Sequence, residues 1–313
     1  MAEPETARRS LEWTLRALAK LPLPVLHALG AGLGTLLAYL PTRARQVARL
    51  NLALCFPELP QRERRRLRRR GLAETAKAIL EVAPVFKRPP EQTEGWIRRI
   101  HGEAHLQAAI ERGRGVVVLI PHLGCWELLN LWLATRHPFT ALYRPPRDPA
   151  LEPILVQART RSGTRLLPAG ARGVRGALRA LERQEAVGIL PDQEPDGSEP
   201  FAPFFGIPAK TMTLASRVTE RTGATPIFAF AERLPRGRGF ALHFLPAEPA
   251  VADPDPETAT AALNRGVEAC VRRAPAQYQW TYKRFDTRPD GTRLYPRGKR
   301  GMRAYLKRWT RRL

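Results

Sequence analysis

The stretch that decides the fold reads V-V-V-L-I-P-H-L-G-C-W-E-L-L-N and runs from Val116 to Asn130. Its first five residues are apolar and mostly β-branched, which predicts a buried strand, and the apolar run after Gly124 predicts a helix. His122 stands in the turn between them, and Glu127 follows in the first turns of the expected helix. Ligands of open α/β sheets bind beyond the carboxyl ends of the strands, so this turn is a place where chemistry is expected.

Two interpretations of His122 and Glu127 are open at this point. A carboxylate that faces the imidazole would fix its tautomer and raise its basicity, which would prepare His122 to take a proton from a hydroxyl. Alternatively, the histidine caps the helix and the glutamate is simply favoured near its positive end. The spacing of five residues does not separate the two.

The charge balance points to anionic partners. The chain has 313 residues, enough for one large α/β domain with additions or for two small domains. It contains 52 Lys and Arg against 29 Asp and Glu, a formal charge of +23, which favours nucleic acid, acidic lipid head groups or an acidic carrier protein. A nucleic-acid-binding protein is opposed by the spread of arginines over the whole chain and by the lack of a known binding signature, so we expect no nucleic acid partner.

The three cysteines indicate a reducing compartment. Cys55, Cys125 and Cys270 are widely separated, odd in number and form no C-x-x-C pair. This pattern predicts neither a disulfide framework nor a metal site, and we expect no metal. Cys125 lies within the opening stretch, where its apolar neighbours favour packing over nucleophilic catalysis.

We divide the chain into four regions: 1–45, 46–95, 96–296 and 297–313. Region 1–45 opens with an amphipathic segment and continues into the uncharged run from Leu21 to Leu40, which is about as long as a membrane span. Arg43, Arg45 and Arg49 follow and would hold that end at an anionic cytoplasmic surface. We predict a membrane-associated helix and no removed signal peptide, with a pair of buried core helices as the alternative.

Region 46–95 contains the most concentrated positive charge. The run from Gln61 to Arg70 reads Q-R-E-R-R-R-L-R-R-R, which is typical of a solvated helix face and would also contact acidic lipids or an acidic protein. Three prolines between Pro84 and Glu94 predict a linker into the third region.

Region 96–296 alternates short apolar strands with helices, the pattern of an α/β fold with a mostly parallel sheet. We expect strands at 116–121, 139–143, 186–191, 225–231 and 240–245, and helices around 151–158, 174–181, 214–218 and 263–271. Polar residues follow four of the strands, so their side chains are expected along one sheet edge: His122, Arg144, Asp192 with Gln193, and Glu232 with Arg233. Exposed loops are also polar for no functional reason.

Aromatic residues mark two later segments. Phe201, Phe204 and Phe205 lie in a Pro- and Gly-rich loop and either line a groove for a hydrocarbon chain or pack the loop onto the sheet. Residues 275–285 and the tail 297–313 interleave aromatic with basic side chains, a mixture suited to stacking on bases or to a lipid interface.

Together these motifs resemble the lipid A late acyltransferases, the lauroyl and myristoyl acyltransferases of the bacterial lysophospholipid acyltransferase superfamily. The resemblance covers roughly residues 10 to 297. It rests on the order and spacing of several motifs: the His-x4-Glu of His122 and Glu127, the Asp-Gln at 192 and 193, the F-F-G at 204 to 206, the T-P-I at 225 to 227 and the P-x-Q-Y-x-W at 275 to 280.

The resemblance implies a glycerol-phosphate-acyltransferase type of α/β fold with an N-terminal membrane helix. It implies an enzyme at the cytoplasmic face of the bacterial inner membrane that moves a fatty acyl group from acyl carrier protein to a hydroxyl of a lipid A precursor. The acyl-carrier-protein thioester is the donor substrate, and no cofactor is expected. Another glycolipid or an aminolipid is the alternative acceptor.

The mechanism that we expect combines the residues with the resemblance. His122 acts as general base, Glu127 orients and stabilises the imidazolium, and backbone N–H groups at the start of the following helix stabilise the oxyanion. Asp192 has a structural or acceptor-positioning role. The remaining expected substrate-binding residues are Arg144, Arg159, Gln193, Phe204, Phe205, Gly206, Lys210 and Arg233.

Overall fold

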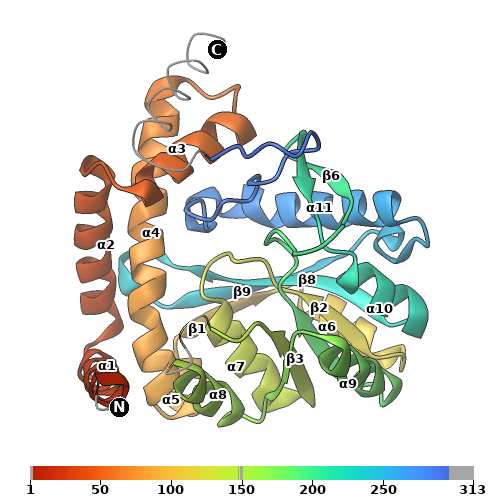
Figure 1. The fold of residues 1–313 in the computed structure, drawn as a ribbon. Coiled ribbons are helices and arrows are strands. Elements are labelled where there is room, and N and C mark those ends of the chain that lie inside the picture. Colours follow the sequence, from red (N-terminus) through yellow and green to blue (C-terminus); the bar gives the residue numbers. More distant parts are fainter. Residues whose placement is uncertain (1–2, 147, 149–150, 296–313) are drawn as a thin grey trace.

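A seven-stranded sheet forms the centre of the computed structural model, which describes residues 3–146, 148 and 151–295 (Figure 1). The strand order is β1-β9-β8-β2-β5-β3-β4, and every neighbouring pair is parallel except β8 with β9. The strands are β1 Ile97–His101, β2 Val116–Leu119, β3 Phe139–Tyr143, β4 Arg165–Pro168, β5 Ala186–Ile189, β8 Thr225–Arg233 and β9 Phe240–Pro246. The predicted α/β fold with a mostly parallel sheet is confirmed.

Strand β2 lies in the middle of the sheet and is buried on both faces. Val116 and Val118 belong to one core cluster, whereas Val117 and Leu119 belong to the other. This alternation follows from the two-residue period of a strand, and the continuous apolar run is what a strand covered on both faces requires. The turn that carries His122 therefore begins at the centre of the sheet edge.

Helices cover both faces of the sheet. Figure 1 shows α11 on one side of β8 and β9, with α6 and α7 on the other. The helices of this part of the chain are α5 Pro90–Glu94, α6 Glu103–Glu111, α7 Trp126–Arg136, α8 Glu152–Thr160, α9 Ala171–Glu182, α10 Leu214–Thr222 and α11 Pro256–Arg273. Short 3₁₀ turns occur at Pro235–Gly237, Pro249–Ala252 and Pro275–Gln277.

All five predicted strands are present, but the sequence patterns missed four others. Strands β1 and β4 are the two edges of the sheet and are only partly buried, so neither carries a full apolar run. Strands β6 (Phe201–Phe204) and β7 (Ile207–Lys210) form a separate antiparallel hairpin inside the segment that we expected to be a loop.

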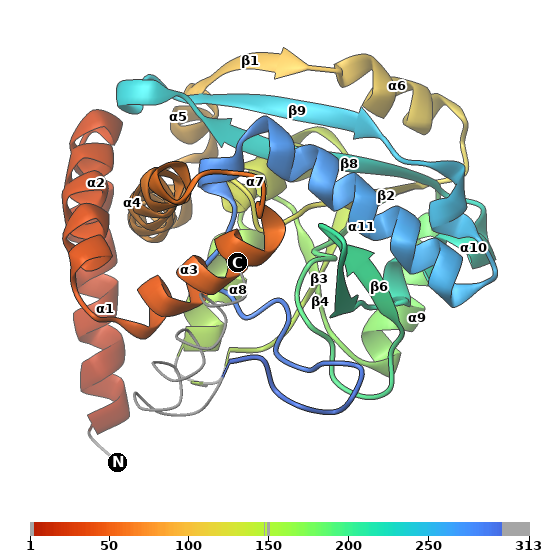
Figure 2. The same cartoon turned by 90° about the horizontal axis from the view of Figure 1, so that it is seen from above.

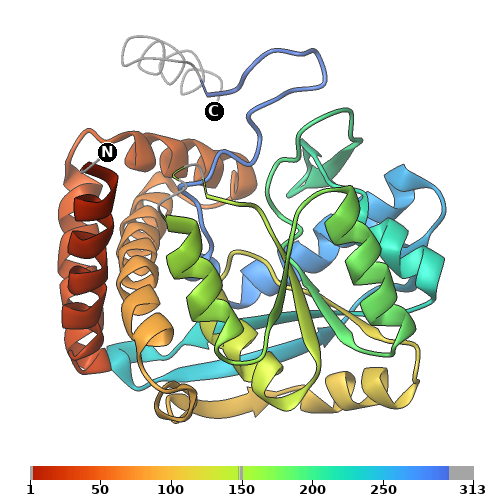
Figure 3. The ribbon, with the colours of Figure 1, turned by 60° about the horizontal axis from the view of Figure 1, so that its bottom comes forward.

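The first four helices gather at one end of the sheet, as seen from above in Figure 2. They are α1 Glu3–Ala19, α2 Leu23–Tyr39, α3 Arg43–Cys55 and α4 Gln61–Lys87. Figures 1 and 3 both show α2 running beside α4. The predicted linker at Pro84–Glu94 was wrong: α4 continues through Pro84 because Val85 and Phe86 are buried in the core, and α5 follows almost at once.

The N-terminal helices do not include a single one long and apolar enough to span a bilayer within the part of the chain that the structure describes. Taken together, the segments Arg9–Ala19 and Leu23–Tyr39 are long and apolar enough to span a bilayer, but a bend of 118° separates them. One face of α2 is buried against α4, whereas Leu29, Leu33 and Leu36 are 51, 50 and 57% exposed. Membrane association of the N-terminal region therefore stays a prediction. The basic aromatic tail 297–313 lies outside the described residues.

Close packing of α2 on α4 depends on glycine. A Cβ atom at Gly34 would stand 2.4 Å from both the Cα of Ala73 and the carbonyl oxygen of Leu72, and one at Gly30 would stand 2.8 Å from the Cα of Lys77. These are backbone atoms, which cannot move aside without separating the helices.

We predict that Gly34→Ala lowers the free energy of unfolding by about 1–3 kcal/mol through overpacking. Gly32→Ala is the matched control, because a Cβ there meets nothing within 4 Å. It should instead stabilise the helix by roughly 0.5–1 kcal/mol. Denaturant unfolding of the two variants tests this, and equal stability of both would contradict the packing argument.

Candidate active site

His122 lies in the loop after β2 and is hydrogen-bonded to Asp192, which lies in the loop after the neighbouring strand β5. The ring Nδ1 is 2.8 Å from Oδ1 of Asp192, and the backbone N–H of His122 donates to Oδ2 at 3.0 Å. Burial raises the pKa of Asp192, but the charge of His122 in its protonated form and these two hydrogen bonds outweigh burial and hold the pKa below its ordinary value. Asp192 is therefore an acceptor only, so Nδ1 of His122 carries the proton.

The second ring nitrogen of His122 meets an amide. The Nε2 atom of Gln193 is 3.1 Å from Nε2 of His122 and also donates to Oε1 of Gln279 at 3.4 Å. Because an amide nitrogen only donates, Nε2 of His122 is the unprotonated, accepting nitrogen. The expected grouping of His122, Asp192 and Gln193 at one sheet edge is confirmed, and it leaves the ring in the tautomer that a general base needs.

The loop that carries His122 is fixed by its backbone. Gly124 has φ +67°, and a Cβ atom there would stand 1.9 Å from the carbonyl oxygen of Ala231, so the loop passes β8 at a distance that only glycine allows. Cys125 N–H donates to that same oxygen at 2.9 Å, and Gly124 N–H donates to the carbonyl of Gln277 at 3.2 Å. Helix α7 starts at Trp126, so these backbone contacts of Gly124 and Cys125 fix the direction in which the helix begins.

Glu127 does not hold His122, which corrects our expectation. Its two carboxylate oxygens are bound by the guanidinium of Arg159, with Nε to Oε2 at 3.0 Å and the terminal nitrogen to Oε1 at 2.5 Å. Glu127 is 8% exposed, so this bidentate pair between α7 and α8 is largely desolvated. Burial lowers the pKa of Arg159, but the charge of Glu127 and its hydrogen bonds raise it more, so the guanidinium stays charged. The carboxylate that orients the imidazole is Asp192.

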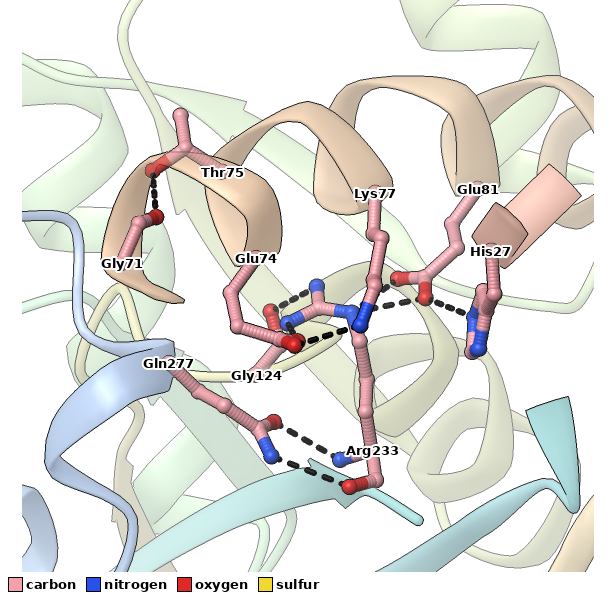
Figure 4. Close-up of polar contacts among 9 residues, drawn as sticks. All are labelled: His27, Gly71, Glu74, Thr75, Lys77, Glu81, Gly124, Arg233 and Gln277. Carbon is pink, nitrogen blue, oxygen red and sulfur yellow. Dashed lines mark hydrogen bonds and ion pairs between the residues drawn. The ribbon is translucent and has the colours of Figure 1, made fainter. Parts of the chain in front are cut away.

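Arg233 was expected to bind a phosphate or phosphopantetheine group, but its position is structural. Figure 4 shows its guanidinium between Glu81 of α4 and the carbonyl of Gly124. Nε is 2.6 and 2.8 Å from the two carboxylate oxygens of Glu81, and a terminal nitrogen donates to the Gly124 oxygen at 2.7 Å. With only 2% of its side chain exposed, Arg233 connects the N-terminal helices to the His122 loop.

His27 completes this network, which accounts for a histidine in the uncharged N-terminal run. Its Nε2 is 2.5 Å from Oε1 of Glu81, whose side chain is fully buried. Burial raises the pKa of Glu81, but Arg233 and the hydrogen bonds from both partners overcome this and lower it. Glu81 was not predicted from the sequence. The signal that was available is a carboxylate in the second half of α4, within the otherwise apolar run from Ala78 to Phe86.

The other expected cationic ligands lie apart from this centre. Arg144 follows β3 and forms an exposed ion pair with Asp196 at 2.9 Å. Lys210 ends β7, and its carbonyl accepts a hydrogen bond from Arg284 at 2.6 Å. The structure does not bring either side chain to His122, and their roles as substrate ligands stay predictions.

The F-F-G motif is a tight turn. Phe205 and Gly206 connect β6 to β7 with φ +51° and +74°, the two positive values of a type I′ hairpin turn. Phe204 is fully buried, with its ring centroid 5.0 Å from Phe205 and 6.0 Å from Tyr278. The motif therefore packs the hairpin onto the core, the second of our two alternatives, and Phe204 lines no open groove.

Three of the aromatic residues near 275–285 are also core residues and Tyr282 is partly buried, so the segment does not form the exposed surface that stacking on bases would need. Tyr278, Trp280 and Phe285 are at most 4% exposed. Burial and then the charge of Asp192 raise the pKa of Tyr278 well above its ordinary value, which keeps its phenol neutral beside the site. The glutamines between the aromatic residues make the specific contacts: Gln277 exchanges two hydrogen bonds with the Arg233 backbone, and Gln279 N–H donates to the His122 carbonyl at 3.1 Å.

No group of three or more His, Cys, Asp or Glu side chains is arranged to hold a metal ion within residues 3–146, 148 and 151–295. All three cysteines are buried, and burial is the first cause that raises their pKa values, to about 12 for Cys270. The thiols are therefore poor nucleophiles.

The fold is α/β, and its candidate site is a histidine hydrogen-bonded to a buried aspartate at the carboxyl edge of the parallel part of the sheet. Residues 11–287 match the model of the bacterial lipid A biosynthesis acyltransferases, and the chain belongs to this family.

Characterised relatives cover most of the chain. A lipid A biosynthesis lauroyltransferase of Escherichia coli K12 is 31% identical over 87% of this chain and 89% of its own length. A lipid A biosynthesis palmitoleoyltransferase of the same organism is 32% identical over 87% of this chain and 88% of its own length. A lipid A biosynthesis myristoyltransferase of that organism is 25% identical over 83% of this chain and 81% of its own length.

The Glu81–Arg233 pair predicts a specific dependence of stability on pH. In Glu81→Gln, Arg233 stays buried with only the more distant carboxylate of Glu74, at 3.7 Å, as a counter-charge, so the free energy of unfolding should fall by about 3–5 kcal/mol at neutral pH. The folded-state pKa of Glu81 is lowered from its ordinary value of 4.5, so the pair stabilises the protein above that value and the contribution is lost as the pH falls through the lower folded value. The difference between wild type and variant should therefore shrink in acid.

Denaturant unfolding across a pH series measures this difference. Glu248→Gln is the control, because it removes an ion pair with Arg265 in which both side chains are about half exposed. Its effect should stay below about 1 kcal/mol. A Glu81→Gln effect as small as that of the control would contradict the structural role of the buried pair.

Proposed function

We propose that this enzyme transfers a fatty acyl group from the thioester of acyl carrier protein to a hydroxyl of a lipid A precursor, at the cytoplasmic face of the bacterial inner membrane. The relatives named as lauroyl-, palmitoleoyl- and myristoyltransferases of lipid A biosynthesis support both the reaction and the acceptor. The observation that carries the chemistry is the 2.8 Å contact between His122 Nδ1 and Asp192, which leaves Nε2 as a base. A different glycolipid or an aminolipid is the remaining alternative for the acceptor.

In the proposed reaction, the acceptor hydroxyl takes the place of the Gln193 amide at Nε2 of His122. The nitrogen removes the hydroxyl proton as the oxygen forms a bond to the thioester carbonyl carbon. The tetrahedral intermediate then collapses, the carbon–sulfur bond breaks, and the imidazolium returns the proton to the leaving thiolate. Asp192 stabilises the imidazolium without itself accepting the proton.

Two further groups have roles in this proposal. The first N–H groups of α7 lack partners within the helix and lie at its positive end, so they are suited to stabilise the oxyanion of the intermediate. Glu127 acts through Arg159, which it holds in one orientation as a charged, planar donor for a phosphate of the acceptor. This replaces the direct contact with His122 that we expected from the sequence.

We predict that His122→Ala lowers the rate of acyl transfer by about 10²-fold or more, as the loss of a general base requires. Asp192→Asn removes the counter-charge of the imidazolium, so kcat should fall at least about tenfold. Glu127→Gln loosens Arg159 and should raise KM for the acceptor more than it lowers kcat.

Acyl transfer from acyl carrier protein to a purified lipid A precursor, followed by mass spectrometry, gives these rates. His105→Ala, at an exposed position of α6, is the control and should keep full activity. Near-normal transfer by a folded His122→Ala protein would overturn the mechanism. Transfer to another glycolipid at a higher kcat/KM would overturn the assignment of a lipid A precursor as the acceptor.

For the membrane contact we propose that α2 lies on the bilayer through its exposed apolar face. Leu29, Leu33 and Leu36 follow one another at helical spacing on the face opposite to α4, and Trp13 of α1 is 73% exposed. A leucine stripe of this kind on a folded protein marks a site of contact with another apolar phase. The packed face, with Gly30 and Gly34, cannot serve this purpose because α4 covers it.

We predict that the triple variant Leu29→Ser, Leu33→Ser and Leu36→Ser binds neutral phosphatidylcholine vesicles about 100-fold more weakly. Each half-exposed leucine contributes roughly 1 kcal/mol on entering the acyl region, so three contribute about two powers of ten in affinity. Vesicle flotation measures the binding. Leu151→Ser, at the N-terminal end of α8, changes an exposed leucine elsewhere and should have no effect. Unchanged flotation of the triple variant would contradict the proposed contact.

A further inference from the structure

A groove rich in arginine lies at the end of the N-terminal helices that is remote from α1. It is formed by the end of α2, by α3 and by the start of α4, which meet on one side of the molecule in Figure 1. Its volume is about 1160 Å³, and eight arginines and one glutamate line it. We call this feature the arginine groove and define it by Tyr39, Arg45, Arg49, Arg65, Arg68 and Arg69.

The positive charge of the arginine groove is not balanced within the described part of the chain. There, no carboxylate forms an ion pair with Arg45, Arg49, Arg65 or Arg68, and the Nε atoms of Arg45 and Arg68 are buried without a hydrogen-bond partner. Residues 297–313 contain no Asp or Glu, so they add only positive charge. Two other buried arginines, Arg159 and Arg233, are each paired with a carboxylate.

The unbalanced charge of the groove makes the protonated form of two of these arginines less favourable. Burial first, and then repulsion from Arg45 and the neighbouring arginines, lowers the pKa of Arg49 and of Arg68. Like charges held together in a partly desolvated hollow cost stability unless an anion enters. The arginine groove therefore has the properties of a binding site whose ligand supplies the missing negative charge.

The surroundings of the groove indicate which anion. Tyr39 lines it and is 67% exposed, and Leu36 and Leu40 are exposed at the same end of α2. The apolar stripe of α2 thus leads directly to the arginines, which places hydrocarbon next to anionic oxygen. A guanidinium binds phosphate oxygens bidentately, and the groove is large enough for a lipid head group.

We propose that the arginine groove binds the phosphate of an anionic membrane phospholipid, with the acyl chains of that lipid against the exposed face of α2. The proposal extends the membrane contact proposed above and does not depend on the acyl-transfer reaction. A small acidic protein is the competing ligand. It fits less well because the exposed leucines at the end of α2 lie beside the arginines, an arrangement that matches the acyl chains and phosphate of a lipid rather than a charged protein surface.

The experiment is vesicle flotation of the full chain with phosphatidylcholine alone and with phosphatidylcholine containing phosphatidylglycerol. The triple variant Arg45→Gln, Arg49→Gln and Arg68→Gln should lose about 100-fold in its preference for the anionic vesicles. The control Arg172→Gln, Arg175→Gln and Arg179→Gln removes the same charge from the exposed face of α9. It should lose less than about threefold, because charges beyond a Debye length are screened. An equal loss of this preference in both variants would show that the overall charge of the protein attracts it to anionic vesicles. That result would overturn the arginine groove as a specific site.

A stability measurement separates a binding role from a structural one. Arg68→Gln relieves repulsion, so it should raise Tm in the absence of lipid, and it should reduce the further rise in Tm that wild type shows with soluble short-chain phosphatidylglycerol. A lower Tm of Arg68→Gln with an undiminished response to the lipid would overturn the proposal. A response of wild type to inorganic phosphate alone equal to that to the lipid would overturn the assignment to phospholipid.

Two results distinguish the neighbouring proposals. If the triple arginine variant keeps its lipid preference but loses binding to acyl carrier protein, the groove is a protein docking site and the phospholipid proposal is wrong. If wild type fails to float with any vesicle, the membrane contact of α2 is wrong, while the response of Tm to soluble phosphatidylglycerol still decides the groove.

Discussion

The buried ion pair between Glu81 and Arg233 is the constraint on which the rest of the structure depends. Both side chains are almost fully removed from water, so each charge needs a close partner inside the protein, and the shortest contact of Arg233 with a carboxylate is the 2.6 Å to Glu81. Glu81 belongs to α4 and Arg233 to the end of β8, which means that the N-terminal helices can only dock where the two meet. Because Arg233 also binds the carbonyl of Gly124, the docking position fixes the loop in front of α7.

A continuous set of hydrogen bonds extends this constraint to His122. The side chain of Gln277 is bound to the Arg233 backbone, the Gln277 carbonyl accepts from Gly124, and Gln279 N–H donates to the carbonyl of His122. Asp192 then fixes the ring itself from the other side, through the neighbouring strand. The imidazole is thus positioned by groups from several separate parts of the chain, as the base that we propose would need to be.

Features that depend on neighbouring residues could be predicted from the sequence, whereas contacts between residues far apart along the chain could not. The five strands and the place of His122 are local: an apolar, β-branched run ends at a polar turn. The partner of His122 is not local, because Asp192 stands 70 residues away and reaches it only through the adjacency of β2 and β5. Sequence spacing suggested Glu127 instead, but that side chain is directed to Arg159. Glu81 was hidden for a similar reason: a charge in a long basic helix indicates solvent, not a buried partner 152 residues away.

The N-terminal run shows why hydropathy alone could not decide between a membrane span and a core helix. Between Leu21 and Leu40, apolar character comes from two faces with different functions. Glycines and alanines allow α2 to pack against α4, and leucines cover the opposite face, which no other described element contacts closely enough to bury. Hydropathy sums over both faces and so reports one uniformly apolar segment. The distribution of residue size around the helix carries the missing information, because the glycines that allow close approach lie on the face toward α4 and the exposed leucines lie on the other face.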